Sequence, residues 1–247
     1  MTAGIRVFPL EGIPEVEQGD DLAALLADAA ERAGGLEDAD VVVVAQKAVS
    51  KAEGRVVQLE GIEPSERARK LAGGRDARHV EVILRESARI VRSRPPLLIA
   101  ETRHGFVCAS AGVDASNAKG AGTLVLLPLD PDASAAAIRE SLRARTGREV
   151  AVIVSDSFGR PFRQGTTDVA LGVAGLTPLL DLAGVRDRAG YELQGTEIAV
   201  ADEIAGAAEL VLGKTRGVPA AVVRGVDLRG EGTGRDLLIP PERNLFG

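Results

Sequence analysis

The sequence has few aromatic residues and almost no cysteine. Its 247 residues include five Phe, one Tyr and no Trp, and Cys108 is the single cysteine. One cysteine excludes an intrachain disulfide, which fits a reducing compartment. So few aromatic rings cannot supply the stacking platforms on which proteins bind single-stranded nucleic acid. The core must therefore be built from Ala, Val, Leu and Ile.

Long apolar runs and an excess of positive charge are also missing. No apolar stretch approaches the ~18–20 residues that span a membrane. The N-terminus has no basic region followed by an apolar stretch, so it does not resemble a secretory signal. Thirty basic and 36 acidic residues give a net charge of −6, opposite to the balance of most phosphate-backbone binders. We therefore expect a cytoplasmic protein with neither membrane nor long nucleic acid as a partner.

The remaining composition is that of a folded globular protein, with 45% hydrophobic and 27% charged residues. The length allows one large domain or two small ones. Periodic patterning fades after residue 228, where glycines and prolines interrupt it. We therefore expect one domain over residues 1–228 and a tail or linker over residues 229–247.

Hydrophobic periodicity predicts strands and helices in mixed order. The four-valine run at residues 41–45 is typical of a strand that is buried on both faces. Because some strands are adjacent and others are separated by helices, the pattern favours an α+β fold of mixed, largely antiparallel sheets with flanking helices. The expected strands are residues 5–8, 41–45, 97–100, 105–109, 123–127, 150–154 and 218–223, and the expected helices are residues 21–33, 64–73, 76–87, 133–145 and 196–212.

Two polar loops after apolar strands are candidates for a metal site. Ser155, Asp156 and Ser157 follow one expected strand, and Asp114 and Asn117 follow another. Mg²⁺ and Mn²⁺ prefer such oxygen ligands, and nucleotide phosphates commonly complete their coordination. The alternative is that each Asp forms a turn by capping its own backbone.

A third polar cluster, residues 49–55, follows the four-valine strand. Lys51 is a candidate to neutralise a phosphate, with Arg160 and Arg163 contributing from a later segment. The alternative is a solvated hairpin turn. Two histidines and one cysteine support neither a hydrolytic triad nor a structural zinc site.

The tripeptide Gly213-Lys214-Thr215 imitates the end of a phosphate-binding P-loop. That motif requires a glycine where this chain has Ala208, and it must follow a strand, whereas this segment leaves an expected helix. The motif alone is better explained as a helix C-terminus with a favourably placed cation.

The polar segments, taken in order, resemble the coenzyme F420-0:γ-glutamyl ligase family. The resemblance covers nearly the whole chain, and each motif is short, so it is their joint order that is specific. The matching stretches are Gly12-Ile-Pro-Glu-Val, Gly19-Asp-Asp-Leu, Val49-Ser-Lys-Ala-Glu-Gly-Arg, Ala111-Gly-Val-Asp-Ala-Ser-Asn, Ser155-Asp-Ser-Phe-Gly-Arg-Pro-Phe-Arg, Val200-Ala-Asp-Glu-Ile-Ala and Pro219-Ala-Ala-Val-Val-Arg-Gly.

The resemblance implies an intertwined homodimer that uses GTP to join L-glutamate to F420-0, a deazaflavin with a phospholactyl tail. It implies Mg²⁺ or Mn²⁺, with K⁺ as a further ion, and metal ligands at Asp114, Asp156 and Ser157. The nucleotide contacts of the family fall on Ile13, Pro14, Glu15, Val16, Gln46, Lys51 and Asn117.

Three features depart from the family pattern. Some relatives have Ser or Thr in place of Gln46. The loop after the last helix is basic here, whereas archaeal relatives carry an acidic residue in it, so we expect Lys214 or Arg216 to meet phosphate directly. Actinobacterial relatives continue into a nitroreductase-like domain, and residues 238–246 resemble the start of that junction.

The chemistry that the resemblance implies is phosphoryl transfer from GTP to the acceptor carboxylate, followed by displacement by the glutamate amine. Glu203 is our candidate for the base that accepts the amine proton, chosen from the motif Ala201-Asp-Glu-Ile. Two alternatives remain from the sequence: a non-catalytic module that binds a nucleotide or deazaflavin, and another carboxylate–amine ligase on the same scaffold.

Overall fold

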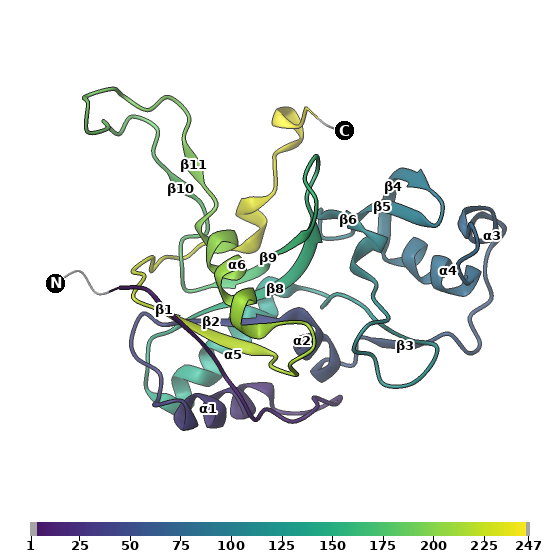
Figure 1. Cartoon of the computed structure of the whole chain (residues 1–247), viewed down its shortest axis with the longest axis horizontal. Coiled ribbons are helices and arrows are strands. Elements are labelled where there is room, and N and C mark those ends of the chain that lie inside the picture. The colour runs from purple at the N-terminus through teal and green to yellow at the C-terminus, as the bar shows by residue number, and fades with distance from the viewer. Residues whose placement is uncertain (1–3, 246–247) are drawn as a thin grey trace.

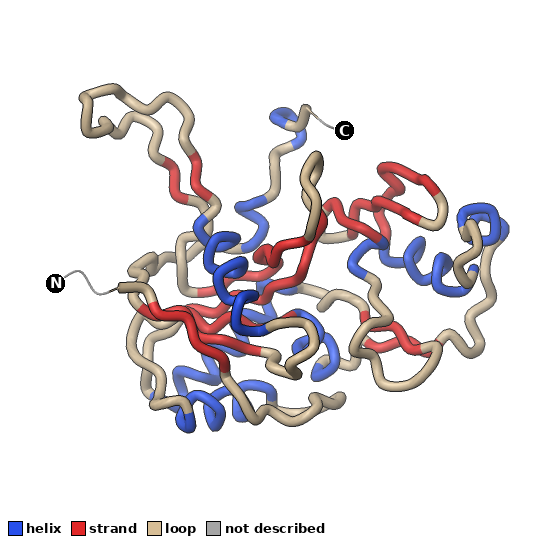
Figure 2. The backbone as a smooth tube through the Cα atoms, viewed as in Figure 1, coloured by secondary structure: helices blue, strands red, loops and turns tan. Residues whose placement is uncertain are grey.

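The computed structural model of the chain describes residues 4–245. It has a large lobe around a five-stranded sheet and a small lobe, residues 56–125, that is inserted between two strands of that sheet (Figure 1). Figure 2 shows helices on both sides of the large sheet and the strands of the small lobe gathered to one side of the molecule.

The large sheet has the strand order β1-β12-β2-β8-β9. Strands β2 and β8 are parallel, and the other neighbouring pairs are antiparallel. The predicted α+β class with mixed and antiparallel sheets is therefore confirmed. The bounds are β1 Arg6–Pro9, β2 Val41–Ala45, β8 Ala151–Gly159, β9 Thr166–Ala174 and β12 Ala220–Arg224.

Side chains of β2 pack on both faces of this sheet, as the four-valine run predicts. Val42 and Val44 belong to the core that α1 (Leu22–Arg32), α2 (Gln46–Ala52) and α5 (Pro131–Thr146) cover. Val41 and Val43 belong to the core beneath α6 (Val200–Leu212) on the opposite face. Because β2 is anchored on both sides, the polar residues that follow it are held at a fixed position.

The ends of α1 and α5 follow the signals in the sequence. The carboxylate of Asp21 accepts a hydrogen bond from the backbone N–H of Ala24, and that of Asp130 accepts one from Ala133. Gly147 ends α5 in the left-handed conformation, with φ of 69°, which a glycine adopts without steric cost. Both predicted helices are confirmed within two residues at each end.

The small lobe packs two helices against a three-stranded antiparallel sheet of order β4-β5-β6. The predicted pair of strands over residues 97–109 is confirmed as β5 and β6. A two-stranded sheet, β3 with β7, joins this lobe to the large one. The bounds are β3 Val56–Gln58, α3 Glu66–Leu71, α4 Ala77–Glu86, β4 Ser87–Arg94, β5 Leu97–Thr102, β6 Val107–Ala109, a 3₁₀ turn η1 Ser110–Gly112, and β7 Thr123–Val125.

Several predictions of local structure were wrong. Residues 46–52 form the helix α2, where a polar loop or hairpin turn was expected. Strand β8 continues to Gly159, so Ser155, Asp156 and Ser157 lie in a strand and not in the loop after it. Strands β4 and β9 were missed, and the last helix begins at Val200 because residues 197–198 form a short strand.

That short strand, β11 (Glu197–Ile198), pairs with β10 (Leu180–Asp181) at the base of an arm that extends away from the large lobe (Figure 1). After β12 the chain forms the 3₁₀ turns η2 (Gly234–Leu237) and η3 (Pro241–Arg243). Asp132 of α5 accepts a hydrogen bond from the backbone N–H of Gly234, which ties the tail to the large lobe. Within residues 4–245 there is no helix both long and apolar enough to cross a membrane.

Candidate functional site

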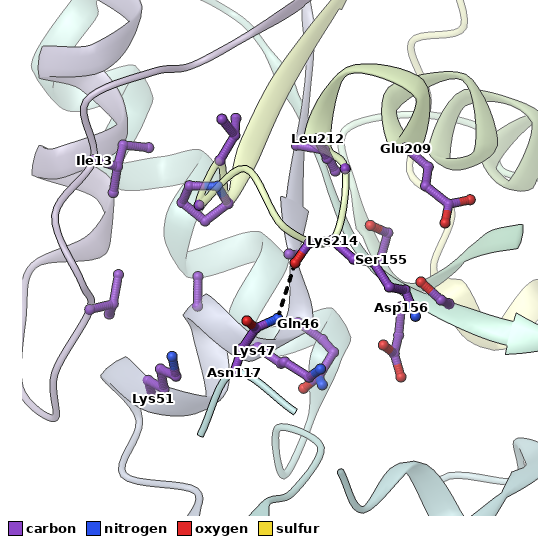
Figure 3. Close-up of a pocket in the computed structure, with 18 of the residues that line it drawn as sticks. Ile13, Gln46, Lys47, Lys51, Asn117, Ser155, Asp156, Glu209, Leu212 and Lys214 are labelled. Carbon is purple, nitrogen blue, oxygen red and sulfur yellow. Dashed lines mark hydrogen bonds between the residues drawn. The ribbon is translucent and has the colours of Figure 1, made fainter. Parts of the chain in front are cut away.

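A pocket of about 350 Å³ lies where the ends of β2 and α6 meet the polar part of β8 (Figure 3). This volume is in the usual range for small-ligand sites, roughly 300–1,000 Å³. Five parts of the chain line it: the N-terminal loop, the start of α2, Asn117, the β8–β9 pair and the loop after α6. The large sheet therefore brings together segments that are far apart in the sequence.

All eight predicted nucleotide contacts line this one pocket. They are Ile13, Pro14, Glu15, Val16, Gln46, Lys51, Asn117 and Lys214. The side-chain amide of Asn117, from the small-lobe side, donates to the backbone carbonyl of Lys214 at 3.5 Å (Figure 3). The loops of the two lobes thus meet at the pocket rim.

The N-terminal loop lines the pocket with both buried and exposed residues. Ile13 and Val16 are buried in the core of the large lobe, at 8% and 5% exposure. Between them Glu15 is exposed, and its carboxylate accepts a hydrogen bond from the ammonium of Lys51 at 2.5 Å. An anion entering here would compete with Glu15 for Lys51.

Gln46, the first residue of α2, is buried and belongs to the wall of the pocket. Its Oε1 accepts a hydrogen bond from the hydroxyl of Ser50 at 2.9 Å. Its Nε2 is buried and has no partner. Because an unpaired buried donor costs about 1–3 kcal/mol, this amide N–H is suited to a hydrogen bond with a ligand.

A bulge in β9, where Leu171 is the extra residue, sets which residues of β9 lie opposite the polar part of β8. The register with β9 shifts between Val154 and Ser155, and Ser157 then pairs with Asp168. The hydroxyls of Ser155 and Ser157 both donate to the Asp168 carboxylate, at 3.0 and 2.6 Å. Asp156 points to the opposite side of the strand from Ser155 (Figure 3), as strand alternation requires.

The Asp156 carboxyl is partly open to the pocket but otherwise surrounded by protein. Desolvation raises its pKa from 3.8 to about 7, and the negative charges of Asp168 and Asp114 add to the rise. The backbone N–H of Ser157 and the charge of Lys47 oppose it. A nearby cation would lower the pKa of such a desolvated carboxyl and stabilise its ionised form.

Asp114, on the small-lobe side, is held by a lysine from the large lobe. The ammonium of Lys47 donates to its Oδ2 at 2.5 Å and to the hydroxyl of Ser116 at 2.7 Å. Burial raises the pKa of Asp114, but hydrogen bonds from Lys47 and Ser116 outweigh it, so the net pKa is lowered. The charge of Lys47 also acts on Asp156, so one ammonium stabilises carboxylates from both lobes.

The structure does not bring every predicted residue into the pocket. Asp156 and Ser157 line it, whereas Asp114 reaches it only through Lys47. Glu203 lies exposed on the first turn of α6 and is not among the lining residues. In the described part of the chain, residues 4–245, no three His, Cys, Asp or Glu side chains form a group that could hold a metal ion.

Three charged residues of the pocket were missed from the sequence: Lys47, Asp168 and Glu209. Lys47 lies one helical turn before Lys51, a spacing that is informative only once α2 is known to be a helix. Asp168 is a buried carboxylate within an apolar strand, which is a rare arrangement. Its backbone N–H donates to the Glu209 carboxylate at 3.0 Å, which links β9 to α6.

The pocket of this α+β fold is polar and is lined by Lys47, Lys51 and Lys214 beside carboxylates, a charge pattern that suits a phosphorylated small molecule. Residues 12–225 match the family described as F420-0:Gamma-glutamyl ligase. The chain belongs to that family.

Similar proteins from three archaea cover almost the whole chain, and each is named coenzyme F420:L-glutamate ligase. The protein from Methanothermobacter thermautotrophicus is 48% identical, over 98% of this chain and 99% of its own length. That from Methanopyrus kandleri is 45% identical over the same shares. That from Archaeoglobus fulgidus is 42% identical, over 98% of this chain and 96% of its own length.

Proposed function

We propose that this chain is an F420-0:L-glutamate ligase of coenzyme F420 biosynthesis, which uses GTP to join L-glutamate to the phospholactyl carboxylate of F420-0. One observation carries the proposal: in a chain of this family, one pocket gathers every residue expected to contact the nucleotide, directly beside Asp156. Further γ-linked glutamates are a possible extension of the same reaction.

The nucleotide occupies the side of the pocket formed by the N-terminal loop, α2 and the loop after α6. Lys51 and Lys214 neutralise phosphate oxygens there, and the buried amide of Gln46 donates a hydrogen bond. The guanidinium groups of Arg160 and Arg163 remain candidates for further phosphate contacts, since they follow the same strand as Asp156.

The donor set beside the nucleotide suits Mg²⁺ or Mn²⁺. It consists of oxygen atoms, and the pKa of Asp156 is raised mainly because its carboxyl is desolvated, so a bound cation would favour the charged form. Asp114, Asp156 and Ser157 would hold the ions, with K⁺ as a further ion. A bound divalent ion supplies charge neutralisation at the phosphate oxygens.

The reaction then needs little covalent chemistry from the protein. An oxygen of the acceptor carboxylate bonds to the γ-phosphorus of GTP, GDP leaves, and an acyl phosphate remains. The amine of glutamate bonds to the acyl carbon, phosphate leaves, and the nitrogen loses a proton. The lysines of the pocket hold the phosphates in place. The role of Glu203 as the base stays a prediction.

Mass spectrometry of F420-0 incubated with GTP, Mn²⁺ and L-glutamate tests the proposal. We expect a product heavier by one glutamyl residue, together with one GDP and one phosphate per bond formed, and no product without GTP. Nucleotide binding without phosphate release would instead support a non-catalytic module. Extension of a different carboxylate would support another ligase on this scaffold.

Gln46→Ala tests the nucleotide assignment. The variant loses a buried amide donor in the pocket wall, so we expect the KM for GTP to rise about 10-fold, as for one neutral hydrogen bond. The KM for glutamate should stay within twofold. The matched control is Gln58→Ala, which removes an amide that bonds Thr123 in the sheet joining the lobes. An unchanged KM for GTP in Gln46→Ala would place the nucleotide elsewhere.

We further infer a homodimer, and the arm at β10 and β11 supports it. The arm extends from the large lobe and exposes Val185 and Tyr191, at 49% and 62%. Apolar side chains on an extended arm gain from burial against a second copy. Sedimentation velocity at assay concentration measures this directly. The cytoplasmic location and the lack of membrane and nucleic-acid partners stay predictions.

A further inference from the structure

Arg75 of the small lobe lies against the segment that carries Asp114. It precedes α4, directly after the Gly73-Gly74 turn, and its side chain is half-buried. Its Nη1 donates to the hydroxyl of Ser110 at 3.1 Å. Ser110 begins the η1 turn, in which all three residues have positive φ, and that turn leads into Asp114. The guanidinium is therefore held beside the turn that leads to Asp114, and Arg75 is not among the residues that line the pocket described above.

This guanidinium has no carboxylate partner. Other half-buried arginines are paired: Arg55 with Glu86 at 2.6 Å and Arg224 with Asp40 at 2.7 Å. None of the ion pairs formed within residues 4–245 includes Arg75. Most of its N–H groups are left free, and a planar fork of N–H donors matches a carboxylate or phosphate.

A second polar atom without a partner lies near Arg75. The Nε2 atom of His79, on the first turn of α4, is buried and makes no hydrogen bond. Burial and the positive charge of Arg75 lower the pKa of this imidazole, while the charge of Asp114 acts in the other direction. The charge of Asp76 acts on His79 in the same direction as that of Asp114. Within residues 4–245 neither carboxylate forms an ion pair with Arg75, because Asp114 pairs with Lys47 and Asp76 with Arg78.

We propose that Arg75, supported by His79, binds a carboxylate or phosphodiester group of a substrate other than GTP, on the small-lobe side of Asp114. The inference rests on the proposed function and deepens it. Glutamate carries carboxylates, and the acceptor carries a phosphodiester and a carboxylate. Lys51 and Lys214 serve the nucleotide across the pocket. The other substrates must approach the nucleotide from another side. Arg75 is a half-buried cation without an ion-pair partner within residues 4–245, so it is suited to bind one of them.

The test compares Arg75→Ala, Arg75→Lys and the control Arg67→Ala in the full chain. Arg67 is an exposed arginine of the same lobe, on α3 at its outer edge (Figure 1). We expect Arg75→Ala to raise the KM for one anionic substrate about 10- to 100-fold, as for a charged hydrogen bond. The KM for GTP should stay within twofold. Arg75→Lys should recover part of the loss because it keeps the charge and loses the fork.

The pattern of the change identifies the group that is bound. A raised KM for glutamate assigns Arg75 to a glutamate carboxylate, and a raised KM for F420-0 assigns it to the acceptor tail. Wild-type values for both substrates in Arg75→Ala would overturn the inference. If Arg75→Ala does not fold, Arg75→Gln takes its place, with the same readouts.

Equilibrium binding separates this inference from the proposed function. If the wild-type chain forms no product, isothermal titration with L-glutamate and with F420-0 is run on the wild type and on Arg75→Ala. Weaker binding of either compound to the variant supports the Arg75 site even though the proposed reaction has failed. Equal binding of both compounds to the two proteins overturns it.

Discussion

Asp156→Asn should lower turnover by about 100-fold or more, because it removes a carboxylate that we propose binds the metal and with it several kcal/mol of charge stabilisation. The fold should persist, since Asn keeps the shape of the side chain on β8. In the metal-free state the variant should be more stable than the wild type at alkaline pH. Steady-state turnover and thermal unfolding measured on the same preparations give both results.

The pH dependence of stability follows from the raised pKa of Asp156. The folded protein keeps this proton up to a pH of about 7, whereas the unfolded chain releases it near 3.8. The contribution to stability is therefore present below the lower value and lost as the pH rises to the upper one. At about pH 8 the ionised group costs the metal-free protein on the order of a few kcal/mol, and less where pocket water screens it.

The matched control is Asp28→Asn, which changes an exposed carboxylate on α1. It should leave both turnover and the pH profile unchanged. Near-normal glutamate addition by Asp156→Asn at saturating Mn²⁺ would contradict the role given to this residue. If the stability of metal-free Asp156→Asn changes with pH as steeply as that of the wild type, the raised pKa assigned to Asp156 is wrong.

Arg224→Met should destabilise the fold by about 3–5 kcal/mol without a specific change at the pocket, because it leaves a buried carboxylate unpaired. The Arg224 guanidinium donates two hydrogen bonds to Asp40, at 2.8 and 2.7 Å, and the Asp40 side chain is only 1% exposed. This pair lies at the start of β2, whereas the pocket lies at its end. Chemical denaturation measures the loss, and the KM for GTP of the folded fraction should stay at the wild-type value.

A double variant separates the unpaired charge from lost packing. Arg224→Met with Asp40→Asn removes both charges, so it should be more stable than Arg224→Met alone. If the single and double variants are equally unstable, packing around Arg224 and not the buried carboxylate determines the loss.

Local signals in the sequence were sufficient to predict an element where the type of a single residue determines the backbone conformation. Asp130, Pro131 and Gly147 mark the ends of α5, and the valines of β2 pack on both faces of the sheet. Most residues taken from the family motifs line one pocket because the motifs follow the polar ends of strands and helices, but Asp114 and Glu203 do not line it.

The missed elements lack such signals. Helix α2 is preceded by Ala45, whose side chain cannot cap it, and the buried stripe of the helix is short. Strand β4 is an edge strand with exposed arginines, and β9 contains a glycine that suggests a turn. The extension of β8 depends on a bulge and on pairing with β9, so it is a tertiary feature. Asp168 and Arg75 could not be recognised as candidate site residues from the sequence, because the residues they contact are distant in the chain.

The central claim is that carboxylates from both sides of the small-lobe insertion, Asp114 and Asp156, serve one divalent ion beside the nucleotide. Electron paramagnetic resonance titration of Mn²⁺ in the presence of GTP tests it most directly. We expect Asp114→Asn and Asp156→Asn each to weaken Mn²⁺ binding about 10-fold or more, and the double variant to lose less than the sum of the two. Full Mn²⁺ affinity in Asp114→Asn, with loss confined to Asp156→Asn, would contradict the claim.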